Sequence, residues 1–190
     1  MEKAHYSAIV LLALCAFVLA LLIRGVDVSW AWLGAVGISI SVVGIGIFVF
    51  DHYLWRFGWL YGKFHKRPNL AGLWDVVFRS TYDDGSGQPI VRNGTMRIDQ
   101  TFFNLDTFVE TDESEGVVIS REFVRLGKDR PRLCATYRNE PRATFRQSSQ
   151  MHYGTLLVSF DEPARRPERL SGNYWTDRET RGELDAIRRG

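Results

Sequence analysis

Cysteine and histidine are scarce in this chain, and their scarcity argues against several kinds of site. The 190 residues include two cysteines, Cys15 and Cys134, and four histidines. Cys15 lies within an apolar run and Cys134 within a predicted strand, so we expect no disulfide. The histidines do not have the spacing of metal ligands: His5, His52, His65 and His152. We therefore expect neither a disulfide scaffold nor a metal centre.

The sequence also lacks the motifs of common enzymes. It contains no nucleophile elbow, no phosphate-binding glycine loop and no CxxC pair. Its glycine-rich stretch at 85–87 has the composition of an ordinary hairpin turn. The chain is therefore predicted to be a binding protein rather than an enzyme, and to need no cofactor.

A large excess of either charge is absent too. The 24 Lys and Arg residues nearly match the 22 Asp and Glu residues, for a net charge of +2, so binding to a DNA or RNA polymer is not indicated. Beyond the first fifty residues the basic residues are mostly arginine, since lysine is limited to Lys63, Lys66 and Lys128. Arginine suits phosphate and carboxylate groups and stacks on rings, although a surface of solvated ion pairs has the same composition.

The chain does contain two long apolar runs, at 6–23 and 28–50, separated by the turn 24–27. As helices they would extend about 27 and 35 Å, enough to cross the roughly 30 Å hydrocarbon core of a bilayer. The first run is longer than the apolar part of a signal peptide, and no small-residue cleavage pattern follows it. Residues 1–50 are therefore predicted to form a membrane hairpin of two antiparallel helices.

Basic and aromatic residues flank these runs in a way that predicts their orientation. Lys3 precedes the first run, the turn offers only Arg24, and four basic residues closely follow the second run: Arg56, Lys63, Lys66 and Arg67. By the positive-inside rule, both termini and the rest of the chain face the cytoplasm. Aromatic side chains suit the two membrane interfaces: Trp30 and Trp32 at one, and Trp55, Trp59 and Tyr61 at the other.

The second run carries small residues on one helix face, at Gly34, Gly37, Ser41 and Gly44. Small residues let helices approach closely in lipid. The partner of this face is either the first run of the same chain or a second copy of the chain, and the sequence leaves both open. Neither run contains an interior charged residue, so an ion path is not expected.

After a basic, aromatic juxtamembrane linker at 51–68, the pattern changes to short strands separated by turn residues. We expect residues 69–190 to form an all-β cytoplasmic domain with eight strands, at 72–81, 94–102, 105–110, 117–125, 132–138, 153–160, 170–177 and 180–187. Eight short strands favour a small closed antiparallel barrel, which leaves no sheet edge. A flattened sandwich is the alternative.

Polar residues continue the inward face of several predicted strands. Each such face is apolar at one end and polar at the other, as where Leu170 is followed in phase by Tyr174 and Arg178. We expect the polar ends to meet at one mouth of the barrel, over an apolar floor, as a ligand site: Gln100, Tyr137, Asn139, His152, Tyr174, Thr176 and Arg178. The alternative is that they are core groups with internal partners. The inward arginine requires either an acidic residue or an anionic ligand.

The order of several short motifs along the chain gives a further indication. These motifs are LAGLW at 70–74, GTMRIDQ at 94–100, YRNEP at 137–141, HYGT at 152–155 and LSGNYWTDR at 170–178. Together with the N-terminal hairpin, the chain resembles the two-transmembrane, β-strand-rich effectors of CBASS, the cyclic-oligonucleotide signalling system of bacteria against phages. The resemblance covers essentially the whole chain.

The resemblance implies a minimal barrel that senses a cyclic dinucleotide made by a partner nucleotidyltransferase after infection. Sensing would drive self-assembly, the membrane segments would disrupt the inner membrane, and the infected cell would die. It also implies ligand contacts: Arg178 at a phosphate, Tyr137 and Tyr174 stacked on the bases, and Gln100, Asn139, His152 and Thr176 at base or ribose edges. One arginine is few for two phosphates, so a second chain or one of three further arginines is expected to contribute: Arg138, Arg142 or Arg146.

Two other functions fit the same pattern of membrane runs and strands. One is a membrane-anchored, lipocalin-like binder of an apolar metabolite, which a cavity with no cationic group at its mouth would favour. The other is a structural anchor that recruits a protein to the membrane, which a barrel filled by its own side chains would favour.

Overall fold

The computed structural model describes most of the chain, namely residues 15, 17–19, 21–23, 25, 30–82, 88, 90–125, 131–147, 149–160 and 165–190. The chain divides into two compact units, Met1–Val49 and Phe50–Gly190, and each is described by itself.

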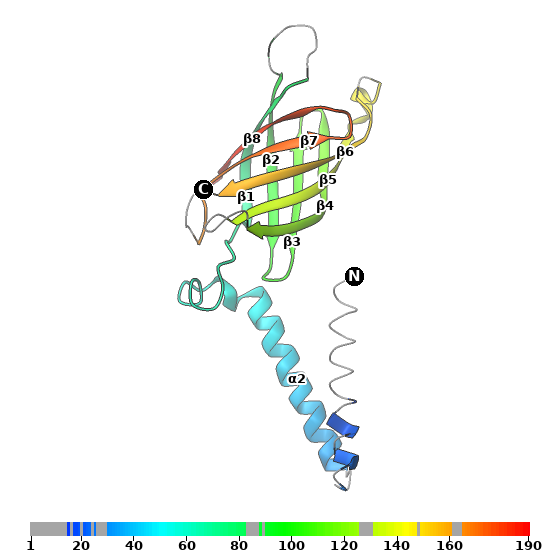
Figure 1. The fold of residues 1–190 in the computed structure, drawn as a ribbon, viewed down its shortest axis with the longest axis vertical. Helices are drawn as coiled ribbons and strands as arrows, with labels where there is room; N and C mark the ends of the chain where they lie inside the picture. The colour runs from blue at the N-terminus through cyan, green and yellow to red at the C-terminus, as the bar shows by residue number, and fades with distance from the viewer. Residues whose placement is uncertain are drawn as a thin grey trace. The chain divides into compact units, whose positions relative to one another are not determined.

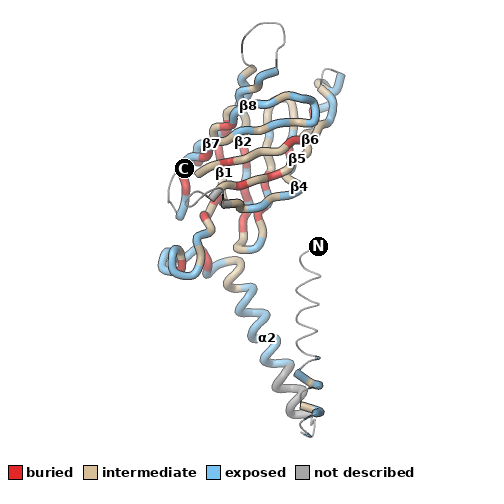
Figure 2. The backbone as a smooth tube through the Cα atoms, in the orientation of Figure 1, coloured by how far each residue is buried: buried red, intermediate tan, exposed pale blue. Residues whose placement is uncertain are grey.

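The described part of the first unit consists mainly of one helix, α2 (Trp30–His52). Of the helices in the described residues, one, over Gly37–Arg56, is long and apolar enough to cross a membrane. Its large apolar side chains are exposed, as the pale blue stretch of α2 in Figure 2 shows: Ile38, Val42, Val43, Ile45, Ile47 and Phe48. A helix that is apolar all round suits a lipid environment. The predicted first span at 6–23 lies mostly outside the described residues.

The second unit contains the predicted barrel, a single antiparallel sheet closed in the order β1 to β8 with β8 paired to β1 (Figure 1). Its strands are β1 (Gly72–Ser80), β2 (Ile90–Gln100), β3 (Leu105–Thr111), β4 (Ser114–Arg125), β5 (Pro131–Pro141), β6 (His152–Phe160), β7 (Arg169–Thr176) and β8 (Arg181–Arg188). All eight predicted strands are present, and the sandwich alternative is wrong because the sheet closes on itself. β2, β4 and β5 are longer than predicted because pairing continues to Ile90 opposite Ser80 and to Ser114 opposite Pro141.

Because neighbouring strands are antiparallel throughout, strand direction alternates around the barrel. The odd-numbered strands end at one rim, which we call the mouth, and the even-numbered strands end at the opposite rim, the base. Side chains alternate inward and outward along each strand. One β-bulge in β4, between Val118 and Ser120, places two successive residues outward and keeps the later ones in phase with the interior.

The apolar core occupies the barrel interior and continues into the base. Trp74 and Leu70 are fully buried there, and the Trp74 Nε1 donates to the Leu70 carbonyl at 3.0 Å. Arg188 is only 7% exposed and lies 4.3 Å from the centroid of the Trp74 ring. Its guanidinium donates to the backbone carbonyls of Pro167, Ala71 and Asn69. Burial lowers the pKa of Arg188, yet these three acceptors satisfy a cation that has no carboxylate partner in the described part.

Residues 51–68, which we call the collar, are folded onto the base of the barrel. Trp55, expected at a membrane interface, is instead 1% exposed, and its ring packs edge-on against Phe102 at 6.1 Å. Arg56 Nη2 donates to the Gln100 carbonyl at 2.7 Å. The Phe102 amide donates to the carbonyl of Asp51, in the last turn of α2, at 2.9 Å. The end of α2 is thus hydrogen-bonded to the connection between β2 and β3.

Candidate functional site

The barrel interior is not filled at the mouth, where it contains a cavity of about 540 Å³. The floor is apolar and is formed by inward residues of six strands: Met96, Val109, Leu133, Val158, Leu170 and Leu184. Polar side chains line the rim above them. A cavity of this size with a few convergent polar groups is typical of small-molecule sites.

Six of the seven predicted site residues line this cavity: Tyr137, Asn139, His152, Tyr174, Thr176 and Arg178. They come from β5, the start of β6, β7 and the turn after it. The alternation of β5, β6 and β7 therefore predicted correctly which of these side chains face inward. They meet because the ends of β5 and β7 and the start of β6 all lie at the mouth.

Each of the two cavity tyrosines lies against a glycine on the neighbouring strand. Tyr137 pairs with Gly154 and Tyr174 pairs with Gly182. A Cβ added at Gly154 would lie 2.4 Å from the Tyr137 ring, and one added at Gly182 would lie 2.7 Å from the Tyr174 ring. No side chain larger than hydrogen fits beneath either ring. The glycines therefore fix the tyrosine rings flat along the cavity wall.

Both tyrosines stay neutral at physiological pH. Burial raises the pKa of Tyr137 well above its usual range, and the nearby Tyr174 and Asp177 raise it further. Burial also raises the pKa of Tyr174, against the opposing effect of a hydrogen bond with Ser80. Neutral phenol rings offer a π face and a hydroxyl without repelling an anion.

Arg178 lies in the turn after β7 and is the exposed cation of the predicted set. Its Nη1 lies 3.1 Å from the Ser149 Oγ, 3.3 Å from the Gln150 carbonyl oxygen and 3.5 Å from the His152 Nδ1. None of the ion pairs formed within the described part of the chain includes Arg178. The sequence predicted either an acidic residue or an anionic ligand as the partner of Arg178. No acidic residue is among these contacts. The guanidinium meets a hydroxyl, a backbone carbonyl and an imidazole nitrogen.

Comparison with known proteins identifies the family to which this chain belongs. Residues 65–188 match the family model described as "Cap15, cyclic dinucleotide receptor domain". The chain belongs to this family. It is also 24% identical over 156 residues to CD-NTase-associated protein 15 of Staphylococcus schleiferi, covering 80% of this chain and 78% of that protein. The resemblance to CBASS effectors is thereby confirmed, and the match spans every strand of the barrel.

The description of this family gives the ligand class of its receptor domain as a cyclic dinucleotide. Such a ligand carries two phosphates and two bases. The site therefore needs aromatic or planar groups for stacking and cationic donors for the phosphates. Both kinds of group are present at the mouth.

Gln100, the seventh predicted residue, lies at the base and not in the cavity. It is 4% exposed, its Nε2 donates to the Pro68 carbonyl at 3.0 Å, and its Oε1 accepts from the Leu70 amide at 2.7 Å. The reason is strand direction. β2 runs from mouth to base, so its polar inward end lies opposite the polar ends of β5 and β7. Gln100 therefore holds the chain that enters β1, and we leave it out of the proposed site.

The charged residue of β2 that does reach the mouth is Arg92, which the sequence did not indicate. It lines the cavity in phase with Met96 and pairs with Glu113 at 2.8 Å. Reading the inward face of β2 backward from its apolar part would have found it, because even-numbered strands begin at the mouth.

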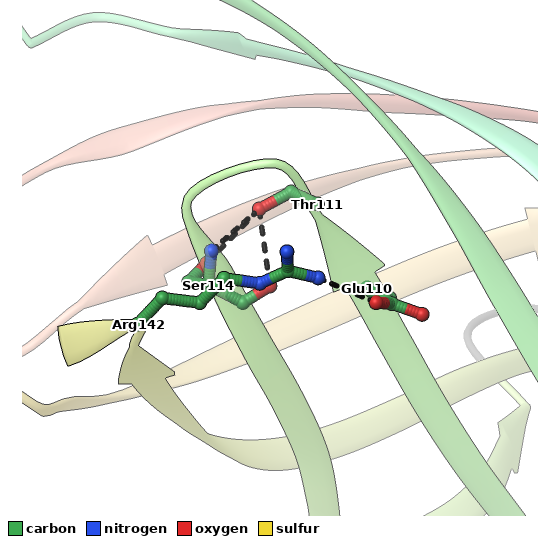
Figure 3. A network of polar contacts seen from close by, with 4 residues as sticks. All are labelled: Glu110, Thr111, Ser114 and Arg142. Atoms are coloured by element: carbon green, nitrogen blue, oxygen red, sulfur yellow. Dashed lines mark hydrogen bonds and ion pairs between the residues drawn. The ribbon is translucent and has the colours of Figure 1, made fainter. Parts of the chain in front are cut away.

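The three further arginines suggested by the sequence do not line the cavity. Arg138 faces outward and pairs with Glu140 at 2.8 Å. Arg142 pairs with Glu110 at 2.5 Å, as Figure 3 shows. In the same view, Thr111 Oγ1 accepts from the Ser114 amide at 3.0 Å and tightens the β3–β4 hairpin at the rim. These ion pairs shape the rim and leave the cavity to other cations.

One further polar residue lies deeper in the cavity. Thr107 on β3 is 8% exposed, and its hydroxyl has no hydrogen-bond partner within the described residues. A buried hydroxyl without a partner is unfavourable, so a ligand atom that bonds to it gains from that deficit.

Proposed function

We propose that this chain is a membrane-bound sensor and effector of CBASS, whose barrel binds a cyclic dinucleotide in the mouth cavity. The observation that carries the proposal is the pairing of Tyr137 and Tyr174, held flat on glycines, with cationic groups at the rim of an apolar cavity. Family membership supports the ligand class. The messenger would come from a cognate nucleotidyltransferase.

In this proposal the two tyrosines stack on the bases, each stack contributing about 1–3 kcal/mol. Arg178 binds a phosphate through charge-assisted hydrogen bonds. Its contacts in the described chain include no carboxylate, so no ion pair is broken when it turns to the ligand. Arg92 binds the second phosphate while still held by Glu113, which offsets part of its charge. Asn139, His152, Thr176 and Thr107 offer donors and acceptors to base or ribose edges.

The effector part of the proposal concerns the membrane. Two spans, at 6–23 and 28–50, would anchor the chain in the inner membrane with both termini and the barrel in the cytoplasm. Ligand binding would stabilise an assembled state by its higher affinity for that state. The small-residue face of Gly34, Gly37, Ser41 and Gly44 would then pack between chains, and the assembled spans would disrupt the bilayer and kill the infected cell.

The two other functions are disfavoured by features of the cavity. A receptor for a wholly apolar metabolite would have no use for arginines at its rim, and both Arg92 and Arg178 line this one. A purely structural anchor is expected to fill its barrel with side chains, whereas about 540 Å³ stays open.

Titration of the full chain in detergent micelles with a panel of cyclic di- and trinucleotides tests the sensor role. We expect saturable binding of at least one cyclic dinucleotide and competition only among nucleotides of that size. Failure of every cyclic dinucleotide to bind would refute the proposal.

Dye release from vesicles that contain the full chain tests the effector role. We expect the cognate ligand to trigger release, and Gly37→Leu/Gly44→Leu to abolish it without weakening nucleotide binding. No described atom lies within 4 Å of a Cβ placed at either position, so the added side chains meet open space in the described chain. Gly46→Leu, at an equally open position off the small-residue face, is the control. Unchanged release in the double variant would exclude this face as the assembly surface.

A further inference from the structure

The collar has two faces with different surroundings. Its inner face packs on the base of the barrel: Trp55 is 1% and Leu60 is 7% exposed. His65 Nε2 lies 2.9 Å from the Trp55 carbonyl oxygen, and Arg56 donates to the Gln100 carbonyl. These contacts make the collar part of the folded barrel unit, so its outer face is presented in a fixed form.

The outer face of the collar is rich in exposed apolar side chains. Five large ones are 40–74% exposed: Tyr53, Leu54, Phe57, Trp59 and Phe64. The rings of Trp59 and Phe64, the two most exposed, pack edge to face with their centroids 6.3 Å apart. Gly62 has a φ of 87°, and its amide donates to the His65 carbonyl at 2.7 Å. This tight turn holds Phe64 out from the barrel.

The same segment has an excess of positive charge. It contains Arg56, Lys63, Lys66 and Arg67 against one acidic residue, Asp51, whose side chain is 16% exposed and accepts from the Phe103 amide. Lys63 and Lys66 are exposed on either side of Phe64, and neither takes part in an ion pair of the described chain. By contrast, arginines on the barrel wall do pair with carboxylates, such as Arg97 with Asp99 at 3.1 Å. The collar thus combines exposed aromatic rings with two exposed lysines that form no ion pair within the described chain.

Continuity with α2 identifies what this face meets. The collar contains the last two residues of α2, which ends at His52, and it overlaps the end of the apolar stretch Gly37–Arg56, which is long enough to cross a bilayer. Aromatic rings and lysines are the residues that favour the headgroup level of a membrane, and cations there attract anionic lipids. A protein partner would account for the exposed rings but not for the excess of positive charge beside them.

We propose that the outer face of the collar is a lipid-binding surface. The Trp59–Phe64 pair lies at the headgroup level of the bilayer, and Lys63 and Lys66 bind the headgroups of anionic phospholipids. The proposal goes beyond nucleotide sensing and requires only that α2 is inserted in the bilayer. Its consequence is that the base of the barrel is held against the membrane by a second contact in addition to the span.

Site-directed spin labelling of the full chain tests the depth of the collar. In a Cys15→Ser/Cys134→Ser background, a nitroxide is attached at Phe64→Cys or Phe57→Cys, both at exposed positions whose replacement removes no core side chain. Val43→Cys on α2, where Val43 is 60% exposed, reports insertion, and Val91→Cys on the outer wall near the mouth, where Val91 is 50% exposed, is the control for water. In vesicles, we expect the two collar labels to be shielded from a water-soluble paramagnetic reagent relative to Val91→Cys, though less than Val43→Cys.

Collar labels as accessible to that reagent as Val91→Cys, with Val43→Cys protected, would overturn the lipid-binding surface and leave the membrane span intact. Loss of protection at Val43→Cys as well would overturn both. Nucleotide titration of the same samples reports separately on the sensor role.

The charge of the collar is tested by lipid composition. We expect addition of phosphatidylglycerol to phosphatidylcholine vesicles to deepen the Phe64→Cys label, and salt to weaken the effect. Lys63→Glu/Lys66→Glu should abolish this dependence on anionic lipid. Arg97→Glu/Arg181→Glu, which makes the same change of charge elsewhere on the barrel, should preserve it. If the depth of the Phe64→Cys label in the parent chain does not change when phosphatidylglycerol is added, the proposed binding of anionic headgroups by the collar would be overturned.

Discussion

Each end of the barrel carries an arginine, but the surroundings of the two arginines differ. At the base, Arg188 is 7% exposed, lies over Trp74 and donates to three backbone carbonyls. At the mouth, Arg178 is exposed, and its Nη1 lies 3.1–3.5 Å from a hydroxyl, a backbone carbonyl and an imidazole nitrogen. The base arginine has its donors satisfied in good geometry, whereas the mouth arginine has donor capacity left over. Satisfaction of donors, rather than residue type, separates a structural cation from one that is available to a ligand.

The amides at the two ends differ in the same way. Both groups of the Gln100 amide are engaged by backbone at the base. Asn139 lines the mouth cavity, and no hydrogen bond is recorded for its side chain in the described chain. One amide closes the barrel, and the other faces the place where a ligand would supply the missing partners.

The largest effect is expected from removal of the base cation. Arg188→Met should lower the free energy of unfolding by about 3 kcal/mol, because it leaves several buried carbonyls without donors and removes the contact over Trp74. Thermal unfolding of the full chain in detergent measures this, with the exposed Arg97→Met as control. At a temperature where the variant is folded, its nucleotide affinity should equal that of the parent. If Arg188→Met lowered nucleotide affinity without lowering the free energy of unfolding, the contrast between a structural arginine at the base and an available one at the mouth would be wrong.

At the mouth, the largest effect is expected from loss of a stacking ring. Tyr137→Ala should weaken cyclic dinucleotide binding by about 10- to 100-fold, which corresponds to one base stack. Gly154→Ala should weaken it as well, since its Cβ would displace the ring. Tyr137→Phe, which keeps the ring, should bind within a few-fold of the parent. Calorimetric titration compares the three variants. If Tyr137→Ala bound the nucleotide as tightly as the parent chain, Tyr137 would not stack on a base.

A smaller effect is expected from the mouth cation. Arg178→Ala should weaken binding by about tenfold, in keeping with about 1.5 kcal/mol for a hydrogen bond to a charged group, and should leave thermal stability unchanged. Arg138→Ala, on the outer wall, should change neither quantity. Affinity should depend less on salt in Arg178→Ala than in the parent. A variant that unfolds instead would place Arg178 with Arg188 among the structural cations.

The smallest effect, and the only gain, is expected at Glu113. Glu113→Gln removes the carboxylate that pairs with Arg92 at 2.8 Å and leaves that guanidinium free for phosphate. We expect affinity to rise by about two- to fivefold, as suits the loss of an exposed ion pair. Isothermal titration at low salt is the suitable measurement. Weaker binding would show that Glu113 itself contacts the ligand.

Much of this architecture could be predicted because the alternation of apolar and polar residues along a strand indicates which side chains face inward. It predicted eight strands and the inward placement of Tyr137, Tyr174 and Thr176. It did not settle which end of the barrel each polar residue reaches, since that depends on strand direction as well as phase. Gln100 and Arg92 lie on the same face of β2 at opposite ends, and counting strands would have assigned them correctly.

Other features depend on contacts between residues far apart in the sequence. Arg188 meets carbonyls at Asn69 and Ala71, more than a hundred residues away, and no local pattern encodes such a contact. The collar posed a different difficulty. Its aromatic residues look alike in the sequence, yet Trp55 is buried and Trp59 is 65% exposed. Only the packing of the segment on the base assigns each ring to one face.

Strand β2 also has a mechanical consequence. It carries Arg92 at the rim of the cavity and, without an intervening loop, reaches Gln100, whose carbonyl is bonded by Arg56. Two residues farther on, the Phe102 amide is bonded to the carbonyl of Asp51 in the last turn of α2. The rim of the cavity and the last turn of α2 are therefore connected through one continuous strand and a short set of hydrogen bonds.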